Sequence, residues 1–510
     1  MNLIDKAIRY INPKAAFKRE VARRGINILN SGYSHHGASH IKKGLVGWDY
    51  SGGSPIEDID ENLQTLRERS RDLYMGTPLA TGALKTIRTN VVGTGIRLKP
   101  QVDAKFLGLS DDEAKNLEES IEREFSLWAD TPNCDYQRLN NFYELQQLVF
   151  LSHLMCGDAI ALLPYKKRVG SAYELTVHLI EADRLCTPYS KRGDINISEG
   201  VEVKNGEVVA YHIANFHPLS YKFNQGKREW NRIEAYGAKT GRRNVIHIME
   251  SERIGQRRGV PLLSPVIESF KQLGRYSEAE LMAAVVTAMY TVFIESETSN
   301  PSGEFGFGNS IPEPMQMDSE DENSYEMGYG SMVELEPGEK IKEANPSRPN
   351  TAFDGFVSSM CKQIGSALEI PNDLLLKQFN ASYSASRAAL LEAWKMFKMR
   401  RSWLTNDFCQ PVYEEWLSEA VAKGRIYAPG FFDDPIIKKA YCTAEWSGPS
   451  AGQLDPVKEV NAAVTRVKNG FSTRTKECIE LTGTDFNKNI DKLSKEEKLL
   501  KEVYPERRND

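Results

Sequence analysis

Two helical segments separated by a long acidic insert constrain the fold of this chain more than any other feature. Pro261 to Glu295 contains a long, mostly apolar helical pattern, and Phe353 to Ile370 contains a second. The longest apolar run, Leu281 to Ile294, has 14 residues. Because a run of this length is too short to cross a bilayer, we expect no transmembrane helix. The pattern instead predicts two helices that bracket an insert.

Charge is distributed unevenly along the chain. Between Glu295 and Glu343 there are 13 acidic residues and two lysines, a net charge of −11 in a chain whose total is −5. This insert fits a solvated loop, and it also fits a surface that repels phosphates or binds a basic partner. Met1 to Arg24 carries seven basic and two acidic residues, which indicates a solvated helix face or a nucleic-acid contact. The near-neutral total excludes a histone-like polycation but allows a local patch that touches nucleic acid.

The remaining pattern is typical of an α+β protein. Short β-rich runs with turn signals fill Ala159 to Ile248, and Asn205-Gly206 between two of them indicates a β-hairpin. Helical periodicity dominates on both sides of this stretch. We expect strands at Ala159–Leu163, Leu175–Ile180, Val201–Val203, Val208–Ile213, Val245–Ile248 and Ser331–Leu335, and helices at Asp111–Trp128, Asn141–Leu154, Pro456–Lys468 and Thr473–Thr482.

Two longer helical stretches carry interruptions. Glu57 to Thr89 is predicted as two helices broken near Pro78. Ala385 to Lys423 is predicted as one long helix that Pro411 should kink, because proline lacks the backbone donor and clashes with the preceding turn. Before it we expect a loop, Pro371 to Ser384. The expected buried faces consist of Leu63, Leu66, Leu73, Leu79, Leu84 and Ile87 in the first stretch, and of Leu390, Trp394, Phe397, Leu404 and Phe408 in the second.

No motif in the sequence predicts an enzyme. The chain lacks the phosphate-binding G-x-x-x-x-G-K-[ST] and the zinc motif H-E-x-x-H. Gly93-Thr94-Gly95 lacks the third glycine of a dinucleotide fingerprint and indicates a tight turn. The seven cysteines are scattered and never in C-x-x-C spacing, so we expect neither disulfides nor a zinc site.

Histidines and acids give no clear reactive set either. His35, His36 and His40 form one cluster in a polar loop, where a solvated role is favoured over metal binding. A carboxylate pair brought together only in space stays possible. From the residues alone, the chain is interpreted as a structural or interaction protein. We expect a structural role for His153, His178, His212 and His247, which lie within or beside element patterns.

Short strings spread along the chain resemble the portal protein family of tailed bacteriophages, of the lambda type. Their order across nearly the whole chain, rather than any single string, is specific. The strings are Arg71-Asp72-Leu73-Tyr74, Pro78-Leu79-Ala80-Thr81-Gly82-Ala83, Asn90-Val91-Val92-Gly93-Thr94-Gly95-Ile96, Ile180-Glu181-Ala182-Asp183-Arg184-Leu185, Ile246-His247-Ile248, Gln256-Arg257-Arg258-Gly259-Val260-Pro261, Tyr383-Ser384-Ala385-Ser386-Arg387-Ala388-Ala389-Leu390, Asp455-Pro456-Val457-Lys458-Glu459 and Gly470-Phe471-Ser472-Thr473-Arg474.

The resemblance implies a ring oligomer, usually of twelve subunits, at one fivefold vertex of the capsid. Double-stranded DNA would be pumped through the ring without sequence specificity by a separate terminase ATPase, retained, and later ejected into the tail. The implied partners are the terminase large subunit, the major capsid and scaffold proteins, head–tail adaptor proteins and further copies of this chain, but no membrane. No cofactor, metal or catalytic residue is implied. The implied location is the portal vertex of the virion, and the host cytoplasm during assembly.

The implied architecture is a portal fold with wing, two-helix stem, clip insert, kinked wing helix and helical crown. The implied segments are a basic N-terminal segment (1–56), the wing with helices and a β-rich part (57–262), a stem helix (263–294), the acidic clip insert (295–345), a second stem helix (346–370), a tunnel loop (371–384), the kinked helix with the return to the wing (385–447) and the helical crown (448–510).

Two sets of candidate site residues come from the resemblance. Lys377, Gln378 and Asn380 in the tunnel loop are candidate DNA contacts, with simple solvation of the lysine as the alternative. Acids of the insert are candidates for docking partner proteins and for an acidic ring that keeps DNA moving. Two other classes stay open: a virion or scaffold protein without a DNA channel, and a metal-dependent enzyme that acts on nucleic acid. The candidate acids are Glu313, Asp318, Glu320, Asp321 and Glu322.

Overall fold

The computed structural model divides into two units, Met1–Asp58 and Ile59–Asp510. The basic N-terminal segment lies mostly outside the described residues, and the second unit contains both hydrophobic core clusters. None of the described helices is long and apolar enough to cross a membrane. The structure describes residues 13–15, 17–19, 21–22, 42–45, 47–48, 52–221, 227–288, 292–296, 339–343, 353–379, 382–452 and 455–503.

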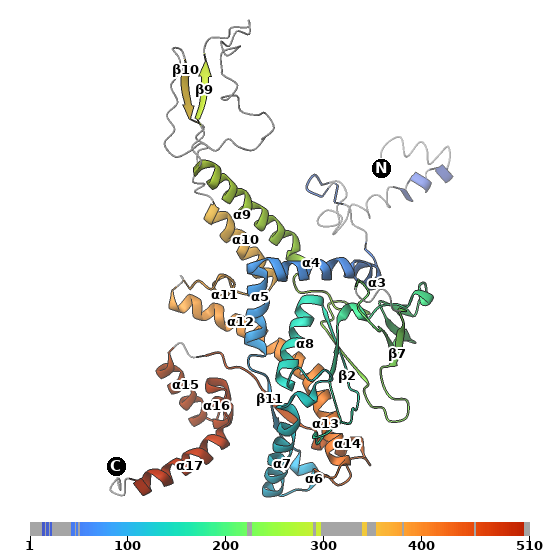
Figure 1. Cartoon of the computed structure of the whole chain (residues 1–510), viewed down its shortest axis with the longest axis vertical. Coiled ribbons are helices and arrows are strands. Elements are labelled where there is room, and N and C mark those ends of the chain that lie inside the picture. Colours follow the sequence, from blue (N-terminus) through green and yellow to red (C-terminus); the bar gives the residue numbers. More distant parts are fainter. Residues whose placement is uncertain are drawn as a thin grey trace, which may run out of the picture. The chain divides into compact units, whose positions relative to one another are not determined.

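A helical body forms the main hydrophobic core (Figure 1). Its centre is an aromatic cluster in which the ring of Phe125 lies 5.0 Å from that of Trp416 and 5.7 Å from that of Phe142. These residues come from three helices far apart in the sequence, so the cluster joins the N-terminal and C-terminal halves of the chain. The helices of the body are α4 (Leu63–Gly76), α5 (Pro78–Val91), α7 (Asp111–Ala129), α8 (Phe142–Cys156) and α13 (Gln410–Ala422).

Local sequence signals explain where these helices begin. Thr77 adopts an extended conformation between α4 and α5, and Pro78 opens α5, as the sequence predicts. Capping boxes start α7 at Ser110 and α8 at Asn141. The expected buried face of the first two helices is largely confirmed: Leu63, Leu73, Leu84 and Ile87 are buried, while Leu66 and Leu79 are partly buried.

The turn at Gly93-Thr94-Gly95 is confirmed as a tight turn that leads into β1 (Arg97–Pro100). Gly95 has φ +115°, and a Cβ atom there would lie 2.4 Å from Cβ of Tyr143. Only glycine fits this position. β1 pairs antiparallel with β11 (Ala444–Ser447), a partner from the other end of the chain that the sequence did not indicate.

Two antiparallel sheets make up the β-rich part. The three-stranded sheet has the order β3-β2-β8, and the four-stranded sheet has the order β4-β5-β6-β7. The Asn205-Gly206 hairpin is confirmed: both residues have positive φ, and Lys204 pairs with Glu207. The strands are β2 (Asp158–Leu162), β3 (His178–Ile180), β4 (Ile197–Ser198), β5 (Val201–Lys204), β6 (Glu207–Ala214), β7 (Trp230–Glu234) and β8 (Val245–Met249).

Helices α9 (Ile267–Ala288) and α10 (Phe353–Ala367) pack against each other (Figure 1), and Tyr276 stacks on Phe353 with 5.5 Å between ring centroids. The helix predicted up to Glu295 ends earlier, because β9 (Val292–Ser296) pairs antiparallel with β10 (Glu339–Glu343). Backbone pairing with a distant partner has overridden the helical pattern there. The strand expected at Ser331–Leu335 lies outside the described residues.

The segment after α10 differs from its prediction in two places. The expected loop Pro371–Ser384 contains a short helix, α11 (Asn372–Leu376), and the next helix, α12 (Tyr383–Leu404), begins before Ser384. The expected single helix with a kink at Pro411 is α12, a π-helical turn at Thr405–Cys409, and α13. The helix runs on without a break, and its irregular turn lies directly before Pro411, where the missing N–H and the ring of the proline act on the preceding turn.

The C-terminal tail consists of α15 (Pro456–Lys468), α16 (Arg474–Thr482) and α17 (Phe486–Val503), which confirms two predicted helices. Ion pairs connect the tail to the body: Arg387 with Glu459 at 3.5 Å, and Lys398 with Glu480 at 3.1 Å. The shorter elements are α3 (Pro55–Ile59), α6 (Ala104–Leu107) and α14 (Pro435–Tyr441).

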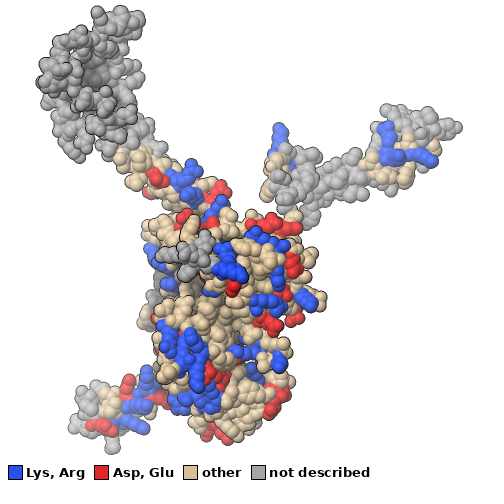
Figure 2. Space-filling model, turned by 45° about the vertical axis from the view of Figure 1, so that its right-hand side comes forward, with Lys and Arg blue, Asp and Glu red and all other residues tan. Residues whose placement is uncertain are grey.

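On the face of the molecule in Figure 2, acidic and basic side chains lie intermixed, and several small groups of Lys and Arg lie on the body. This mixture agrees with the near-neutral total charge of the chain. All seven cysteines are described and are free thiols.

Candidate functional site

The segment between α10 and α12 is held firmly at its N-terminal end. Leu375 of α11 is buried, and Leu374 and Leu376 pack against the main core. The side chain of Asp373 accepts a hydrogen bond from Oγ of Ser386 at 3.2 Å, and its carbonyl accepts one from the backbone N–H of Gln378 at 3.1 Å. Because Ser386 belongs to α12, the first of these bonds ties α11 to the next helix.

Lys377 and Gln378 come directly after α11, and both are exposed. Lys377 has φ +55°, which ends the helix and turns the chain away from it. Phe379 beside them is 54% exposed. The structure therefore presents one cation and one amide on a short exposed segment whose start is anchored in the core. This arrangement suits contact with a phosphate backbone and no covalent chemistry. Asn380, the third candidate, lies outside the described residues.

The candidate acids of the insert, Glu313, Asp318, Glu320, Asp321 and Glu322, also lie outside the described residues. The described part of that region is the β9–β10 ladder, which joins the two sides of the insert. His35, His36 and His40 fall outside as well.

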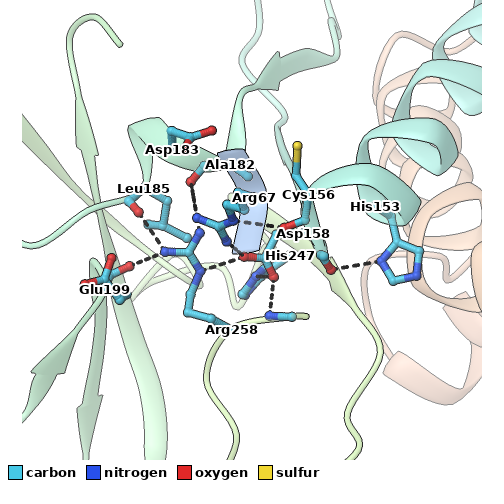
Figure 3. A network of polar contacts seen from close by, with 12 residues as sticks. Arg67, His153, Cys156, Asp158, Ala182, Asp183, Leu185, Glu199, His247 and Arg258 are labelled. Carbon is cyan, nitrogen blue, oxygen red and sulfur yellow. Dashed lines mark hydrogen bonds and ion pairs between the residues drawn. The ribbon is translucent and has the colours of Figure 1, made fainter. Parts of the chain in front are cut away.

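A buried polar network that sequence reasoning missed lies at the junction of the body and the two sheets (Figure 3). Asp158 of β2 is completely buried at its centre, between Arg67, Arg258 and His247. Arg258 Nε donates to its Oδ2 at 2.7 Å, the Gly259 backbone N–H donates to its Oδ1 at 2.6 Å, and Nε2 of His247 lies 3.1 Å from Oδ1.

The two arginines extend the network to backbone carbonyls in other segments. Arg258 donates to the carbonyls of Ala182 at 2.9 Å, Leu185 at 2.7 Å and Glu199 at 2.6 Å. Arg67 of α4 donates to the carbonyl of Cys156 at 2.9 Å. The network thus connects α4, the end of α8, strands β2 and β8 of the three-stranded sheet, and the turns at Ala182–Leu185 and Glu199 around a single carboxylate. Its donors are directed at protein acceptors, so it is a structural connection and not a reactive site.

Electrostatics in this region are set by burial and charge. Burial acts to raise the pKa of Asp158, but Arg258, His247 and Arg67 outweigh it and hold the pKa well below its usual value. Burial, together with Arg258, lowers the pKa of Arg67 to about 10. Burial and the charge of Arg400 lower the pKa of His153 to about 4. These groups therefore keep fixed charge states near neutral pH.

The predicted structural role of the other histidines agrees with their contacts. His153 Nδ1 lies 3.0 Å from the Gly157 carbonyl, His212 Nε2 lies 2.9 Å from a Glu202 oxygen, and His178 stacks on Tyr136.

One cluster has metal-ligand residue types: Glu181, Asp183 and His217 bring ligand atoms within 4.8 Å of one another. Arg71 already binds both carboxylates, Asp183 at 2.6 Å and Glu181 at 3.3 Å, so it fills the position of a cation there.

Much of the network could have been found in the sequence strings themselves. His247 and Arg258 lie in two of them, and Arg71 and Asp183 lie in two others. Arg67 and Asp158 lie in none, and no spacing rule marks them.

The chain belongs to the lambda family of phage portal proteins, because the model of that family matches residues 42–401. The matched region runs from before α3 into α12 and includes the buried network and the segment with Lys377.

Curated relatives agree with this family. The chain is similar to portal protein B of Escherichia phage lambda, with 24% identity over 476 residues that cover 89% of this chain and 87% of the relative. It is also similar to the portal protein of Escherichia phage N15, with 23% identity over 482 residues, 89% of this chain and 88% of the relative.

Among solved structures, the chain is similar to the neck of a native gene transfer agent particle with C12 symmetry, with a TM-score of 0.42 and 12% identity over 82% of this chain and 93% of the other. The neck of an empty gene transfer agent particle with C6 symmetry gives a TM-score of 0.43 and 14% identity over 82% and 92%.

Proposed function

We propose that copies of this chain form a ring at one vertex of a phage capsid, and that double-stranded DNA passes through the ring during packaging and ejection. The family match across residues 42–401 carries this proposal. The relatives, matched over 89% of the chain, support a role for nearly the whole sequence. A ring of twelve copies is the expected assembly. In keeping with its family, we assign the chain no enzymatic role.

The elements of the structure fit the parts that a portal subunit needs. The packed helices α9 and α10 would form the stem, and the β9–β10 ladder would form the base of the clip. Residues 57–262 with α12 and α13 would form the wing, and the tail from α15 to α17 the crown. The segment from Pro371 to Ser384 would be the tunnel loop. Within it, α11 would fix the position of Lys377 and Gln378 relative to the wall of the DNA channel.

The proposed partners correspond to these parts. The terminase large subunit and later the head–tail adaptors would dock at the clip, where the acidic insert offers charge to basic surfaces. The major capsid and scaffold proteins would contact the wing during assembly in the host cytoplasm, and the finished ring would stay in the virion. Asn380 and the five candidate acids keep the roles expected for them.

Negative-stain electron microscopy with light scattering tests the proposal directly. Rings with a central hole and a mass close to twelve times 57.5 kDa are expected. Because some rings need scaffold to assemble, the chain is also co-expressed with the scaffold protein of its own phage. Monomers or dimers under both conditions would overturn the proposal, and metal-dependent cleavage of DNA by such a monomer would establish the enzyme alternative.

A further inference from the structure

A partly exposed cluster beside the four-stranded sheet holds two arginines against aromatic rings. Tyr189 lies in the turn before β4, and its ring is 4.9 Å from that of Trp230, the first residue of β7. The guanidinium of Arg192 lies 4.6 Å from the centre of the Tyr189 ring, and that of Arg228 lies 5.6 Å from it. Arg228 also lies 5.5 Å from the ring of Phe216. These contacts hold both guanidinium groups in place without neutralising them.

Neither arginine has an acidic partner among the described residues. Arg228 donates to the hydroxyl of Tyr189 and to the carbonyl of Pro218, both uncharged acceptors. Arg192 is exposed, its guanidinium contacts the Tyr189 ring, and it forms no ion pair with a described carboxylate. Their neighbour Arg232 differs, because it donates to both carboxylate oxygens of Glu202 at 2.8 and 3.1 Å. Two positive charges are therefore held beside the sheet without a paired carboxylate, and Arg192 is the more exposed of the two.

The surroundings of the cluster favour a protein ligand over a nucleic acid. β7 is an edge strand, since among the described residues it pairs with β6 alone. An edge strand presents unpaired backbone groups that an extended peptide can use. Aliphatic side chains close in sequence to the cluster are also exposed, Ile195 at 87% and Leu219 at 52%. Aliphatic groups and a strand edge match a peptide better than a sugar–phosphate chain.

We propose that this arginine–aromatic surface binds an extended acidic segment of a partner protein. A carboxylate of the segment would pair with Arg192, whose exposed flat guanidinium suits two-point binding, and Arg228 would add its positive charge. The backbone of the segment would lie along the free edge of β7. Since the rings already hold the arginines, little side-chain entropy is lost on binding. This surface uses other residues than the proposed tunnel loop and clip, and its binding does not require the portal ring.

Fluorescence anisotropy with the full-length protein tests the surface. The probe is a fluorescein-labelled octapeptide of alternating Glu and Val, in a buffer near physiological salt. Arg192→Ala is expected to weaken its binding roughly tenfold, because a charged hydrogen-bonded contact is lost. The matched control is Arg69→Ala, which removes an equally exposed arginine of α4 and should leave binding unchanged. This control also accounts for background binding by the basic N-terminal segment. Equal losses in the two variants would overturn the proposal.

Further variants and probes test the geometry and the class of ligand. Arg192→Lys keeps the charge but loses the flat fork, so weaker binding is expected, and unchanged binding would overturn the two-point arrangement. An octapeptide with proline in place of each valine has fewer backbone N–H groups to donate, and it should bind more weakly if β7 is used. Equal binding of this peptide would exclude strand addition.

Binding of a labelled DNA duplex should change alike in Arg192→Ala and Arg69→Ala. A selective loss of DNA binding in Arg192→Ala would instead identify a nucleic-acid site.

Discussion

Arg71 donates two hydrogen bonds to the carboxylate of Asp183, at 2.6 and 3.0 Å, across a sequence separation of 112 residues. One residue belongs to α4 and the other to the turn after β3. Both lie in short strings that identify the family in the sequence, so strings far apart in the chain meet in the folded protein. His247 and Arg258 also come from two different strings, and both contact Asp158 in the folded protein.

Removing the charge of Asp158 should destabilise the protein strongly. Asp158→Asn leaves Arg67 and Arg258 buried without their shared carboxylate, and we expect the free energy of unfolding to fall by about 3–5 kcal/mol. Denaturant titration followed by circular dichroism measures the change. As a control, Asp433→Asn alters an exposed aspartate and should change stability by less than about 0.5 kcal/mol. A small effect of Asp158→Asn would show that the network contributes little to stability.

Stability should depend on pH through Asp183. Burial acts to raise its pKa, but the paired Arg71 holds the pKa below the usual value. Since the folded-state pKa is depressed, the stabilisation is complete above the ordinary aspartate pKa of about 3.9 and is lost as the pH falls further. Asp183→Asn should therefore cost about 2 kcal/mol at neutral pH and weaken the dependence of stability on pH below about 4. Thermal melts from about pH 2.5 to about pH 7 cover this window and provide the measurement.

The control for this experiment is Asp130→Asn. Asp130 forms an exposed ion pair with Arg97 at 3.4 Å, and such a pair contributes little. Its variant should keep the pH dependence of the wild type. If the Asp183 and Asp130 variants respond to acid in the same way, the buried pair is not the source of the pH dependence.

The contact between Gly157 and Gly259 should tolerate no side chain. A Cβ atom on Gly259 would lie 2.0 Å from the carbonyl oxygen of Gly157, a backbone atom that cannot move aside. We expect Gly259→Ala to lower the free energy of unfolding by about 2–3 kcal/mol. Gly274→Ala in α9 is the comparison, because nothing lies within 4 Å of its added Cβ and alanine favours helix by up to about 1 kcal/mol. Equal stabilities of the two variants would contradict the close approach.

Loss of the positive charge at Lys377 should impair DNA packaging or retention and leave the fold intact. The side chain is exposed, so Lys377→Gln should keep the melting temperature of the wild type. If Lys377 contacts phosphates in the channel, the rate of packaging or the retention of packaged DNA should fall severalfold in an in vitro packaging assay. Lys439→Gln on α14 removes the same charge at another exposed position and should package normally. Identical packaging by both variants would favour simple solvation of Lys377.

Neutralising the insert should impair function at the proposed clip. In a variant with Glu313, Asp318, Glu320, Asp321 and Glu322 replaced by their amides, we expect shorter packaged DNA or fewer joined tails. The physical reason is that the acids repel phosphates in the channel or attract basic partner surfaces. Packaged length by pulsed-field gels and tail joining by electron microscopy measure the two effects. Wild-type values for both would contradict either role of these acids.

Local signals determined many elements of this fold. The capping boxes at Ser110 and Asn141, the proline at the start of α5 and the Asn205-Gly206 turn act within a few residues, so their effect can be predicted from the sequence. The segments that were predicted wrongly depend on distant partners. β11 was not expected and pairs with β1 across most of the chain, and Val292–Ser296 is a strand because Glu339–Glu343 lies beside it.

The sequence by itself determined the family, the α+β class and the two helices on either side of an acidic insert, because ordered strings and apolar periodicity are properties of the chain alone. The tertiary structure alone decided which polar residues meet. Asp158 and Arg67 become partners because β2 and α4 both pack on α8, and Arg192 and Arg228 become one surface because the turn at Tyr189 lies against β7. A buried charge requires partners from whatever segment lies near it, and that neighbourhood exists only after folding.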